Sequence, residues 1–375
     1  MLGGIVAEFN PFHNGHKYLI DKARENCDGV VAVMSPNVCQ RGTFSVYDKW
    51  KRALAAVAEG VDLVVELPSG AAISAAPDFA KSAVEILLSL GIEALVFGTE
   101  CESVEKLLNA QKALKEAEES GSVKEALKEG KSYPRALSEK LGEDLLTPNN
   151  ILALEYIKNL PKNVRPIAVK RVGASHDGES TDGIFASASF IRALSREEGE
   201  KFIPEKAARV FSECEKFPEK RAEEVVFSYL KRLSPEEIKK APGVSEGLEN
   251  RIKEALKNSS DFEELKEKIK TKRYTMARIR RILTALFLRI EKGDERPQYI
   301  RVLAFNEKGR EILASAKKSS PLPIITALGD AKKISPAAEK QAEKEAFCTD
   351  MYNLIAKKGV PDGEDFRFSP VPFNK

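Results

Sequence analysis

The sequence predicts an α/β fold in which helices cover both faces of a parallel β-sheet. Three observations predict this fold. Short apolar runs rich in β-branched residues alternate with amphipathic stretches through the first half of the chain. These runs are nearly continuous rather than interrupted by polar residues, which is typical of strands buried on both faces. Polar segments bearing glycine or proline follow the runs, at the edge where such sheets bind ligands.

Each expected strand is a short apolar run bounded by turn residues. In the first half these runs are Leu2–Glu8, Val30–Met34, Val61–Leu67, Ala94–Phe97 and Pro166–Val172. Apolar residues at helical spacing predict three helices between the early strands. These helices span Lys17–Glu25, Val46–Glu59 and Pro77–Leu90.

A long helical insertion is expected between the fourth and fifth strands, at about residues 102–160. It contains Lys131–Arg135 and a helix start at Thr147–Asn150, with a capping threonine followed by proline in the first turn. After Arg192 the composition shifts to charged helix, which continues to Ile290 with breaks at prolines.

A last α/β piece follows the charged helices. It has expected strands at Tyr299–Phe305 and Pro323–Ala327, a turn at Asn306–Gly309 and a final helix rich in Ala, Lys and Glu. We therefore expect an N-terminal α/β domain, a basic helical region and a small α/β tail. Their bounds are residues 1–200, 201–295 and 296–375.

Bulk composition excludes several classes of protein. The 375 residues are 42% hydrophobic and 31% charged, as in a globular protein. No apolar run approaches the roughly 20 residues that span a bilayer, and no secretory signal precedes the first strand. The five scattered cysteines lack CxxC spacing, which favours a reducing cytoplasm over a disulfide framework or structural zinc site. The net charge of +3 is too small to indicate a class of partner, so any surface that binds nucleic acid must be a local cluster of basic residues.

The segment after the first strand carries two of the chain's three histidines, His13 and His16. A strand that turns through proline and glycine into a helix aims unpaired backbone N–H groups at one point, which favours anion binding. Gly15 lets a nucleotide approach the backbone closely. The alternatives are an ordinary helix cap or a metal pair, but only His176 remains as a third histidine and no cysteine is adjacent. The segment predicts the triphosphate site of an adenylating enzyme.

The stretch Ala7–His16 resembles the HxGH signature of the nucleotidyltransferase superfamily, and its wording is similar to that of the bacterial tRNA(Met) cytidine acetate ligases. Weaker echoes lie at Thr271–Thr275 and Arg301–Phe305. The resemblance implies a Rossmann-like parallel sheet of the nucleotidyltransferase type. Its other matches, in order, are Met34–Ser35, Cys39–Gly42, Asp48–Trp50, Gly60–Pro68, Phe97–Glu100, Pro148–Asn150, Lys170–Asp177 and Ala186–Arg192.

The resemblance also implies an activity. Family members use ATP to activate acetate as acetyl-adenylate, then acetylate the N4 amine of the wobble cytidine of elongator tRNA(Met), giving N4-acetylcytidine. Free acetate has a poor leaving group, so the enzyme needs to hold it in line with the α-phosphate and neutralise the departing pyrophosphate. His13, His16 and the helix amides suit both tasks, with Mg²⁺ sharing the charge. No nucleophilic side chain is required.

These arguments together predict the site residues. The predicted catalytic residues are His13, His16 and Lys49. The predicted ATP contacts are Ala7, Glu8, Phe9, Asn10, Pro11, Phe12, His13, Asn14, Gly15, His16, Lys17, Tyr18, Gly98, Asn149, Asn150, Arg171, Ser189 and Arg192.

Several of these roles leave alternatives open. One of Asn149 and Asn150 contacts a base edge or sugar while the other caps its helix. Arg171 reaches a phosphate or the ribose, or forms a surface ion pair. Ser189 and Arg192 lie one helical turn apart and can face one anion, although alone they would indicate only an N-cap and a solvated arginine.

Two features near these residues are less defined. Ala188 stands where many relatives in the superfamily have a second hydroxyl. Asp48, Lys49 and Arg52 lie close in sequence, whereas Asp62 and Glu66 flank a buried strand. The last two either cap the strand, bind Lys49, or hold the cytidine amine or a metal.

A basic helix at Thr271–Ile290 is the candidate RNA surface. One face is apolar and the remainder carries Lys and Arg with no acidic residue. A solvated helix face is the alternative, but the lack of counter-charge favours a surface that follows phosphates. Arg273, Arg278 and Arg281 are the predicted tRNA contacts. Upstream, Pro242–Gly247 has a faint helix-hairpin-helix pattern, whose glutamate would repel phosphate.

Two rival functions fit parts of the sequence. A small-molecule adenylyltransferase explains the first half alone, and a non-catalytic RNA-binding protein could retain the nucleotide fold. The preferred interpretation implies ATP and Mg²⁺ as cofactors, elongator methionine tRNA and acetate as partners, and a cytoplasmic location. It implies no membrane and no stable protein partner. The identity of the acid and of the tRNA rests on the resemblance alone.

Overall fold

A computed structural model of the chain describes residues 1–101, 103–121, 125, 145, 147–172, 183–245, 247–356 and 360–373. Three stretches named above lie outside these residues: Lys131–Arg135, the part of the fifth-strand motif from Gly173 through His176 to Asp177, and the glutamate of the helix-hairpin-helix pattern, Glu246.

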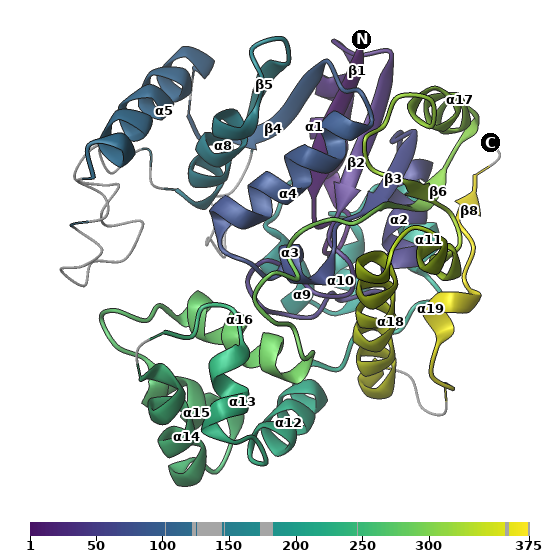
Figure 1. Cartoon of the computed structure of the whole chain (residues 1–375). Helices are drawn as coiled ribbons and strands as arrows, with labels where there is room; N and C mark the ends of the chain where they lie inside the picture. The colour runs from purple at the N-terminus through teal and green to yellow at the C-terminus, as the bar shows by residue number, and fades with distance from the viewer. Residues whose placement is uncertain are drawn as a thin grey trace.

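One mostly parallel sheet organises the described part of the chain (Figure 1). Its strand order is β5-β4-β1-β2-β3-β6-β7, with β8 paired to β6. The strands from β1 to β5 are parallel, and β6 runs antiparallel to β3. The bounds are β1 Leu2–Ala7, β2 Gly29–Met34, β3 Leu63–Glu66, β4 Ala94–Thr99, β5 Arg165–Lys170, β6 Ile300–Phe305, β7 Ile324–Ile325 and β8 Val371–Pro372.

The C-terminal strands extend this same sheet. Pairing of β6 covers the edge of β3 that would otherwise expose unpaired backbone groups. The predicted α/β tail therefore shares its sheet with the N-terminal half. The expected turn at Asn306–Gly309 is wrong in detail, because the Asn306 side chain accepts a hydrogen bond from the Gly309 N–H at 2.9 Å and caps a helix that starts at Glu307.

Helices pack on both faces of the sheet, as expected from strands that are apolar throughout. On one face, α4 and α8 contribute Leu87 and Leu154 to a core that includes Leu95 of β4. On the other face, α1 and α2 contribute Ile20 and Val57. The bounds are α1 Asn14–Arg24, α2 Lys49–Ala58, α3 Ser69–Ala72, α4 Ala76–Ser89, α5 Val104–Glu119, α8 Pro148–Asn159, α17 Glu307–Ala316, η2 Leu328–Lys333, α18 Pro336–Ala356 and α19 Glu364–Arg367.

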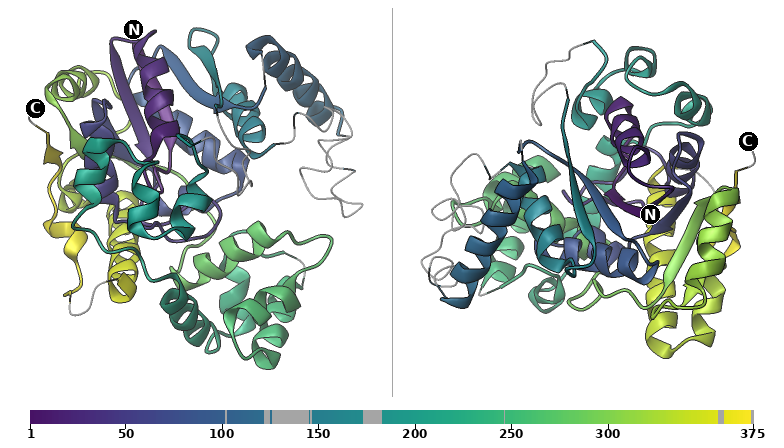
Figure 2. Two further views of the ribbon diagram at one scale, coloured as in Figure 1. Left: turned by 180° about the vertical axis from the view of Figure 1, so that it is seen from behind. Right: turned by 90° about the horizontal axis from the view of Figure 1, so that it is seen from above.

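The charged middle of the chain forms short helices in two groups. The first group lies against the N-terminal strand and helix, which Figure 2 shows from behind in teal and purple. It comprises α9 Ala188–Ala193, α10 Arg196–Glu200 and α11 Glu205–Phe211. The second group forms a lobe beyond the carboxyl ends of the parallel strands (Figure 1). It comprises α12 Glu219–Leu230, α13 Pro235–Lys240, α14 Leu248–Asn258, α15 Phe262–Ile269 and α16 Met276–Phe287.

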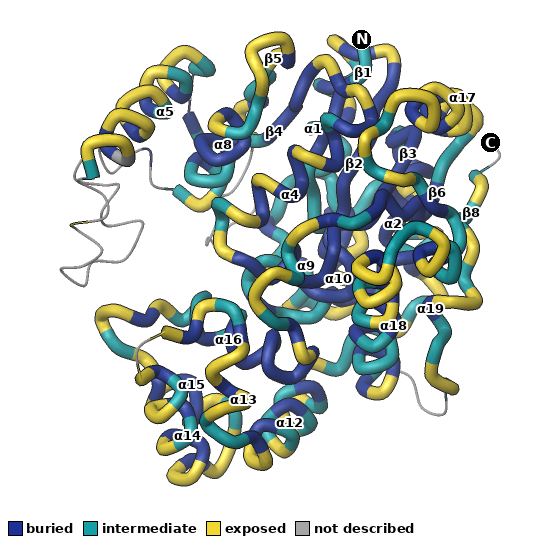
Figure 3. Tube along the Cα trace, in the orientation of Figure 1, coloured by how far each residue is buried: buried dark blue, intermediate teal, exposed yellow. Residues whose placement is uncertain are grey.

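The lobe has its own apolar interior. Leu230, Ile252, Leu265 and Leu283 are almost fully buried, while the outward faces of its helices are exposed (Figure 3). At about 25 cal/mol per Å² of apolar surface, such leucines each contribute roughly 2 kcal/mol of burial free energy. The lobe therefore packs around these side chains, and it lies toward the carboxyl ends of the parallel strands.

Candidate active site

The histidine loop (residues 8–13) leaves β1 and enters α1 through a reciprocal cap. The His13 Nδ1 accepts a hydrogen bond from the Gly15 N–H at 3.0 Å, and the His16 Nδ1 accepts one from the His13 N–H at 3.2 Å. The two imidazoles stack with their centroids 3.8 Å apart. A Cβ on Gly15 would lie 2.9 Å from the His13 ring, so this glycine is required for the ring to fold over the first turn.

These contacts define the tautomer of both rings. A nitrogen that accepts from an N–H carries no proton, so the neutral rings hold theirs on Nε2. Burial, with Arg171 and Arg192 nearby, lowers the pKa of His13 to about 3, and burial and His13 lower the pKa of His16 well below its usual value. Both imidazoles are therefore neutral hydrogen-bond donors at neutral pH.

The backbone of this turn differs from the expectation. The N–H groups of Asn14 and Gly15 donate to the Phe202 carbonyl and the His13 ring. Those of His16 and Lys17 both donate to the His13 carbonyl. The prediction of unpaired amides aimed at a phosphate is therefore wrong, because the side-chain cap and the 200–203 segment already satisfy them. Hydrogen bonds to a bound anion must therefore come from side chains.

Two arginines supply the positive charge beside the rings. Arg192 of α9 donates from Nη1 to the Asn10 carbonyl at 2.8 Å and from Nη2 to the Ser189 hydroxyl at 3.2 Å, so the predicted pair does meet. Ser187 caps α9 by accepting from the Phe190 N–H at 3.1 Å. Because these contacts fix Arg192 against the histidine loop, an anion at the imidazoles would also meet its guanidinium.

The ends of β4 and β5 bring together the second group of predicted residues. Arg171 follows β5, and its Nε lies 3.7 Å from a carboxylate oxygen of Glu100. Asn149 donates to the same carboxylate at 2.5 Å. Asn150 is fully buried, and its side-chain oxygen accepts from the Thr99 hydroxyl at 2.6 Å. A Cβ on Gly98 would meet only Arg171, at 3.7 Å, so no protein neighbour requires glycine there.

An arginine that the sequence did not single out as part of the site holds the histidine loop in place. Arg52 is fully buried in α2 and donates to carbonyls that follow β1 and β2. Its Nη1 lies 2.5 Å from the Glu8 carbonyl and 3.1 Å from that of Ser35, and Nη2 donates to Pro36. Asn10 adds a contact to the next turn by accepting from the Val46 N–H at 2.7 Å. Arg52 shares the first turns of α2 with Lys49 and Lys51, and its spacing alone does not distinguish it from those lysines.

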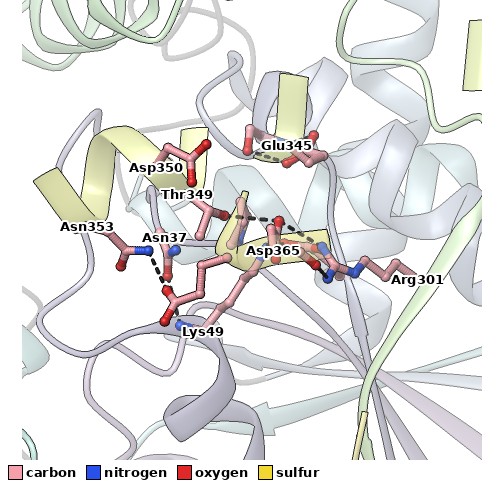
Figure 4. Close-up of polar contacts among 12 residues, drawn as sticks. Asn37, Lys49, Arg301, Glu345, Thr349, Asp350, Asn353 and Asp365 are labelled. Atoms are coloured by element: carbon pink, nitrogen blue, oxygen red, sulfur yellow. Dashed lines mark hydrogen bonds and ion pairs between the residues drawn. The ribbon is translucent and has the colours of Figure 1, made fainter. Parts of the chain in front are cut away.

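Lys49 lies in a buried ion cluster rather than at the histidines (Figure 4). Its fully buried ammonium lies 2.5 Å from Glu66 and 2.8 Å from Asp365. Arg301 of β6 contacts the same two carboxylates at 3.2 and 2.8 Å. The geometry therefore argues against the predicted catalytic role of Lys49, because its charge is already matched and enclosed. The alternative in which Glu66 binds Lys49 is confirmed.

Asp62 lies at the opposite edge of the sheet from the histidines. It precedes β3, and one carboxylate oxygen lies 2.6 Å from Arg24 while the other accepts from the Val30 N–H at 2.8 Å. Because it stands at the amino end of its strand, it holds neither a cytidine nor a metal of this site. Among the described residues, no group of three or more His, Cys, Asp and Glu side chains could hold a metal ion.

A pocket adjoins the histidine loop on the β2 side. It has a volume of about 120 Å³ and lies between the turn before α2 and the segment from α9 to α11. Pro11 and Arg192 form the wall shared with the histidine site. No single sequence segment signals this pocket, because its lining comes from several.

The basic helix α16 places the predicted RNA contacts on the lobe. Arg278 donates to the Gly243 carbonyl at 2.8 Å and lies over the Tyr274 ring, and Arg273 stands beside the same ring. Burial, with Arg278 close by, lowers the pKa of Arg281 to about 10. The tight turn at Gly243 thus packs against the arginines, so the two sequence features form one surface. No helix in the described part of the chain is long and apolar enough to cross a membrane.

The chain matches the family described as HIGH Nucleotidyl Transferase over residues 2–365. A tRNA(Met) cytidine acetate ligase of Clostridium kluyveri is 38% identical over 99% of each chain, and one of Thermoanaerobacter sp. is 40% identical over 97%. Thermotoga maritima TmcAL bound with alpha-thio ATP superposes with a TM-score of 0.90 at 31% identity, and the apo form with 0.92 at 32%, each over the whole of both chains.

The sheet, the histidine loop and this match define a nucleotidyltransferase, and the chain belongs to the HIGH Nucleotidyl Transferase family. Within it, the full-length similarity at 35–40% identity places the chain among the tRNA(Met) cytidine acetate ligases, as the sequence resemblance had indicated.

Proposed function

We propose that this protein uses ATP to activate acetate as acetyl-adenylate and transfers the acetyl group to the N4 amine of the wobble cytidine of elongator tRNA(Met). The observation that carries the proposal is the pair of stacked neutral imidazoles flanked by Arg171 and Arg192. The ATP analogue held by the Thermotoga maritima relative supports ATP as the nucleotide.

In the first step, a carboxylate oxygen of acetate attacks the α-phosphorus and pyrophosphate leaves. The two Nε2–H groups donate to phosphoryl oxygens, and Arg192 balances the charge that develops on the leaving group. Because Nδ1 of each ring is fixed by the reciprocal cap, the donors are oriented before ATP arrives. No side chain forms a covalent bond, so the chemistry is positioning and charge neutralisation.

The described residues offer no protein cage for Mg²⁺ beside the histidines. Mg²⁺ is commonly held through substrate phosphates with few protein ligands. We therefore propose that it enters on the ATP phosphates, and we assign it no protein ligand and no step.

In the second step, the cytidine N4 attacks the acetyl carbonyl carbon, the bond to AMP breaks, and N4 loses a proton. A paired and stacked amine is out of reach, so the base must come from a single-stranded loop. The basic surface around Arg273, Arg278 and Arg281 would hold the remainder of the tRNA. It stands on the lobe that faces the carboxyl edge of the sheet (Figure 1).

Acetate-dependent exchange of labelled pyrophosphate into ATP tests the first step, and mass analysis of tRNA nucleosides tests the second. We expect exchange without tRNA, and N4-acetylcytidine only when tRNA is added. His16→Ala should lower exchange by about 10²–10³-fold, the effect of removing one oriented donor. Lys22→Ala, on the exposed side of the same helix, should leave it unchanged. Pyrophosphate exchange that does not depend on acetate, or that is unchanged in His16→Ala, would contradict the proposal.

A further inference from the structure

The residues assigned to ATP occupy only one half of the carboxyl edge of the sheet. They lie at or just after the carboxyl ends of β1, β4 and β5, or on the helices α1, α8 and α9. On the other side of Pro11, the edge next to β2 is lined by Val46 and Tyr47 and opens into the pocket described above. Arg192 separates the two halves, since its guanidinium holds the histidine loop while its side chain lines the pocket.

The pocket has an apolar floor. Ile191, Ile203 and Phe211 face it from the α9–α11 segment. Tyr47 stacks on Phe211 with the ring centroids 4.4 Å apart, which fixes the wall contributed by the turn after β2. A floor of this kind suits the uncharged face of a flat ring.

The rim of the pocket is cationic. Arg196 donates to the carbonyls of Ser212 and Cys214, and Lys216 donates to the Leu194 carbonyl at 2.5 Å. Together with Arg192 they place three cations at the rim against the single carboxylate of Glu200 in the lining. Burial and the nearby Arg196 lower the pKa of Lys216, as expected where positive charges crowd one another. A phosphate would relieve this crowding.

We propose that this pocket seats the acceptor pyrimidine nucleotide, with its base on the floor and its phosphates at the rim. The inference rests on the proposed function and adds where the acceptor binds. A base seated here lies across Arg192 from the α-phosphate. Its exocyclic amine can then attack the acetyl carbonyl carbon, with AMP leaving through the ATP half and the amine proton passing to solvent.

The test fills the pocket without touching the ATP half. Ala208→Phe places a ring in the pocket, and Ser212→Phe does the same from an exposed position at its mouth. Ala193→Phe is the matched control, because Ala193 is exposed and stands on α9 outside the lining. The readouts are acetate-dependent pyrophosphate exchange, acetylation of an anticodon stem-loop of tRNA(Met), and inhibition of that acetylation by cytidine 5′-monophosphate.

We expect both filling variants to keep exchange within about 3-fold and to lose at least 30-fold in stem-loop acetylation. The concentration of cytidine monophosphate needed for inhibition should rise at least 10-fold, and the control should match the parent protein. Retained exchange shows that each variant is folded. Acetylation unchanged in both variants would overturn the proposal. Loss of exchange in the surface variant Ser212→Phe would also overturn it, because the pocket would then belong to ATP. A parent protein without exchange would instead refute the proposed function.

Discussion

At the scale of single residues, the two rings of the histidine pair share one arrangement. In each ring Nδ1 accepts a hydrogen bond from a backbone N–H, and Nε2–H is left to donate to a ligand. The pKa of His13 is about 3 in the folded chain and near 6.5 when unfolded. The folded state therefore binds fewer protons, and this residue's stabilising contribution is present above about pH 6.5 and is lost as the pH falls toward 3.

The protonation of His13 should respond to ATP. In ¹⁵N NMR spectra of labelled histidines, we expect the free protein to keep both rings neutral, with the proton on Nε2, down to about pH 5. A bound triphosphate favours the protonated ring, so the pKa of His13 should rise on adding ATP and binding should take up protons below neutrality. A ring that titrates near 6.5 in the free protein would contradict this picture.

Arg52 makes a second prediction for a single residue. Its guanidinium is buried without a carboxylate in hydrogen-bond contact among the described residues and instead satisfies the carbonyls of Glu8, Ser35 and Pro36. Arg52→Met should leave these acceptors buried and unpaired, which costs about 3–5 kcal/mol in total. Urea denaturation measures the loss, and exchange activity should fall with it because the histidine loop loses its anchor. Arg209→Met, on an exposed face, is the control and should change stability by less than about 0.5 kcal/mol.

At the scale of elements, the turn between Cys39 and Ser45 links the histidine loop to the basic lobe. The Gln40 N–H donates to Glu8 at 2.6 Å, and Thr284 of α16 donates to the Gly42 carbonyl at 2.7 Å. A Cβ on Gly42 would lie 2.5 Å from the backbone nitrogen of Arg281. Only glycine therefore allows α16 to approach this closely, and the predicted RNA helix is positioned by the same turn that supports the ATP half.

Gly42→Ala tests this link against a matched control. Both Gly42 and Gly293 have positive φ angles, +73° and +102°, but a Cβ on Gly293 meets nothing within 4 Å. Gly293→Ala should cost about 1 kcal/mol of stability from backbone strain alone. Gly42→Ala should cost about 1–3 kcal/mol more and displace α16, lowering tRNA acetylation at least 10-fold while exchange falls far less. Equal effects of the two substitutions would show that the close approach of α16 does not matter.

The arginines of α16 should act on tRNA alone. Replacing Arg278 and Arg281 with Ala should weaken tRNA binding and reduce the slope of log affinity against log salt by about 1 for each phosphate that the variant no longer neutralises. Acetyl-adenylate formation should be spared. A filter-binding titration at several salt concentrations measures the slope, and Arg209→Ala provides the exposed control. Equal loss of both reaction steps would count against the RNA surface.

The sequence predicts those elements whose residues carry their own signal. The strands from β1 to β4 were predicted because burial makes them apolar almost throughout, and β5 because it keeps a short apolar run although it lies half exposed at the edge of the sheet. The histidine loop was predicted because its residues lie together in the chain. The antiparallel pairing of β3 with β6 could not be predicted, because the two strands are more than 200 residues apart. Nothing in the residues of either strand indicates which strand it pairs with. The same holds for Lys49, whose partner Asp365 approaches it from the far end of the chain.

At the scale of the whole molecule, the buried ion cluster ties the two ends of the chain together. Lys49 and Arg301 share Glu66 and Asp365, so Asp365 near the C-terminus completes a site formed by α2, β3 and β6 (Figure 4). The two cations lower the pKa of Asp365 to about 2. Its stabilising contribution is therefore present above about pH 3.8 and is lost as the pH falls through 2.

Removing this carboxylate should loosen the C-terminal third of the sheet. Asp365→Asn leaves two buried cations with one carboxylate between them, and we expect a loss of about 3–5 kcal/mol in the free energy of unfolding. Hydrogen exchange should quicken in β6 and α18 before it does in β1. Asp362→Asn, at an exposed position three residues away, should change neither measurement.

Glu345 of α18 lies in the same part of the molecule, but its effect on stability changes with pH in the opposite direction to that of Asp365. It accepts from the N–H and hydroxyl of Ser69 in α3, at 2.8 and 2.5 Å. Burial and the nearby Glu66 raise its pKa to about 7. The folded state then binds the extra proton, so this contribution is full below about pH 4.5 and is lost as the pH rises through 7. The parent protein should become less stable between about pH 4.5 and 7, whereas Glu345→Gln, which cannot ionise, should flatten that decline in urea denaturation series. Glu343→Gln, exposed on the same helix, should leave the decline unchanged. A variant that declines as steeply as the parent would show that Glu345 is not the group that titrates.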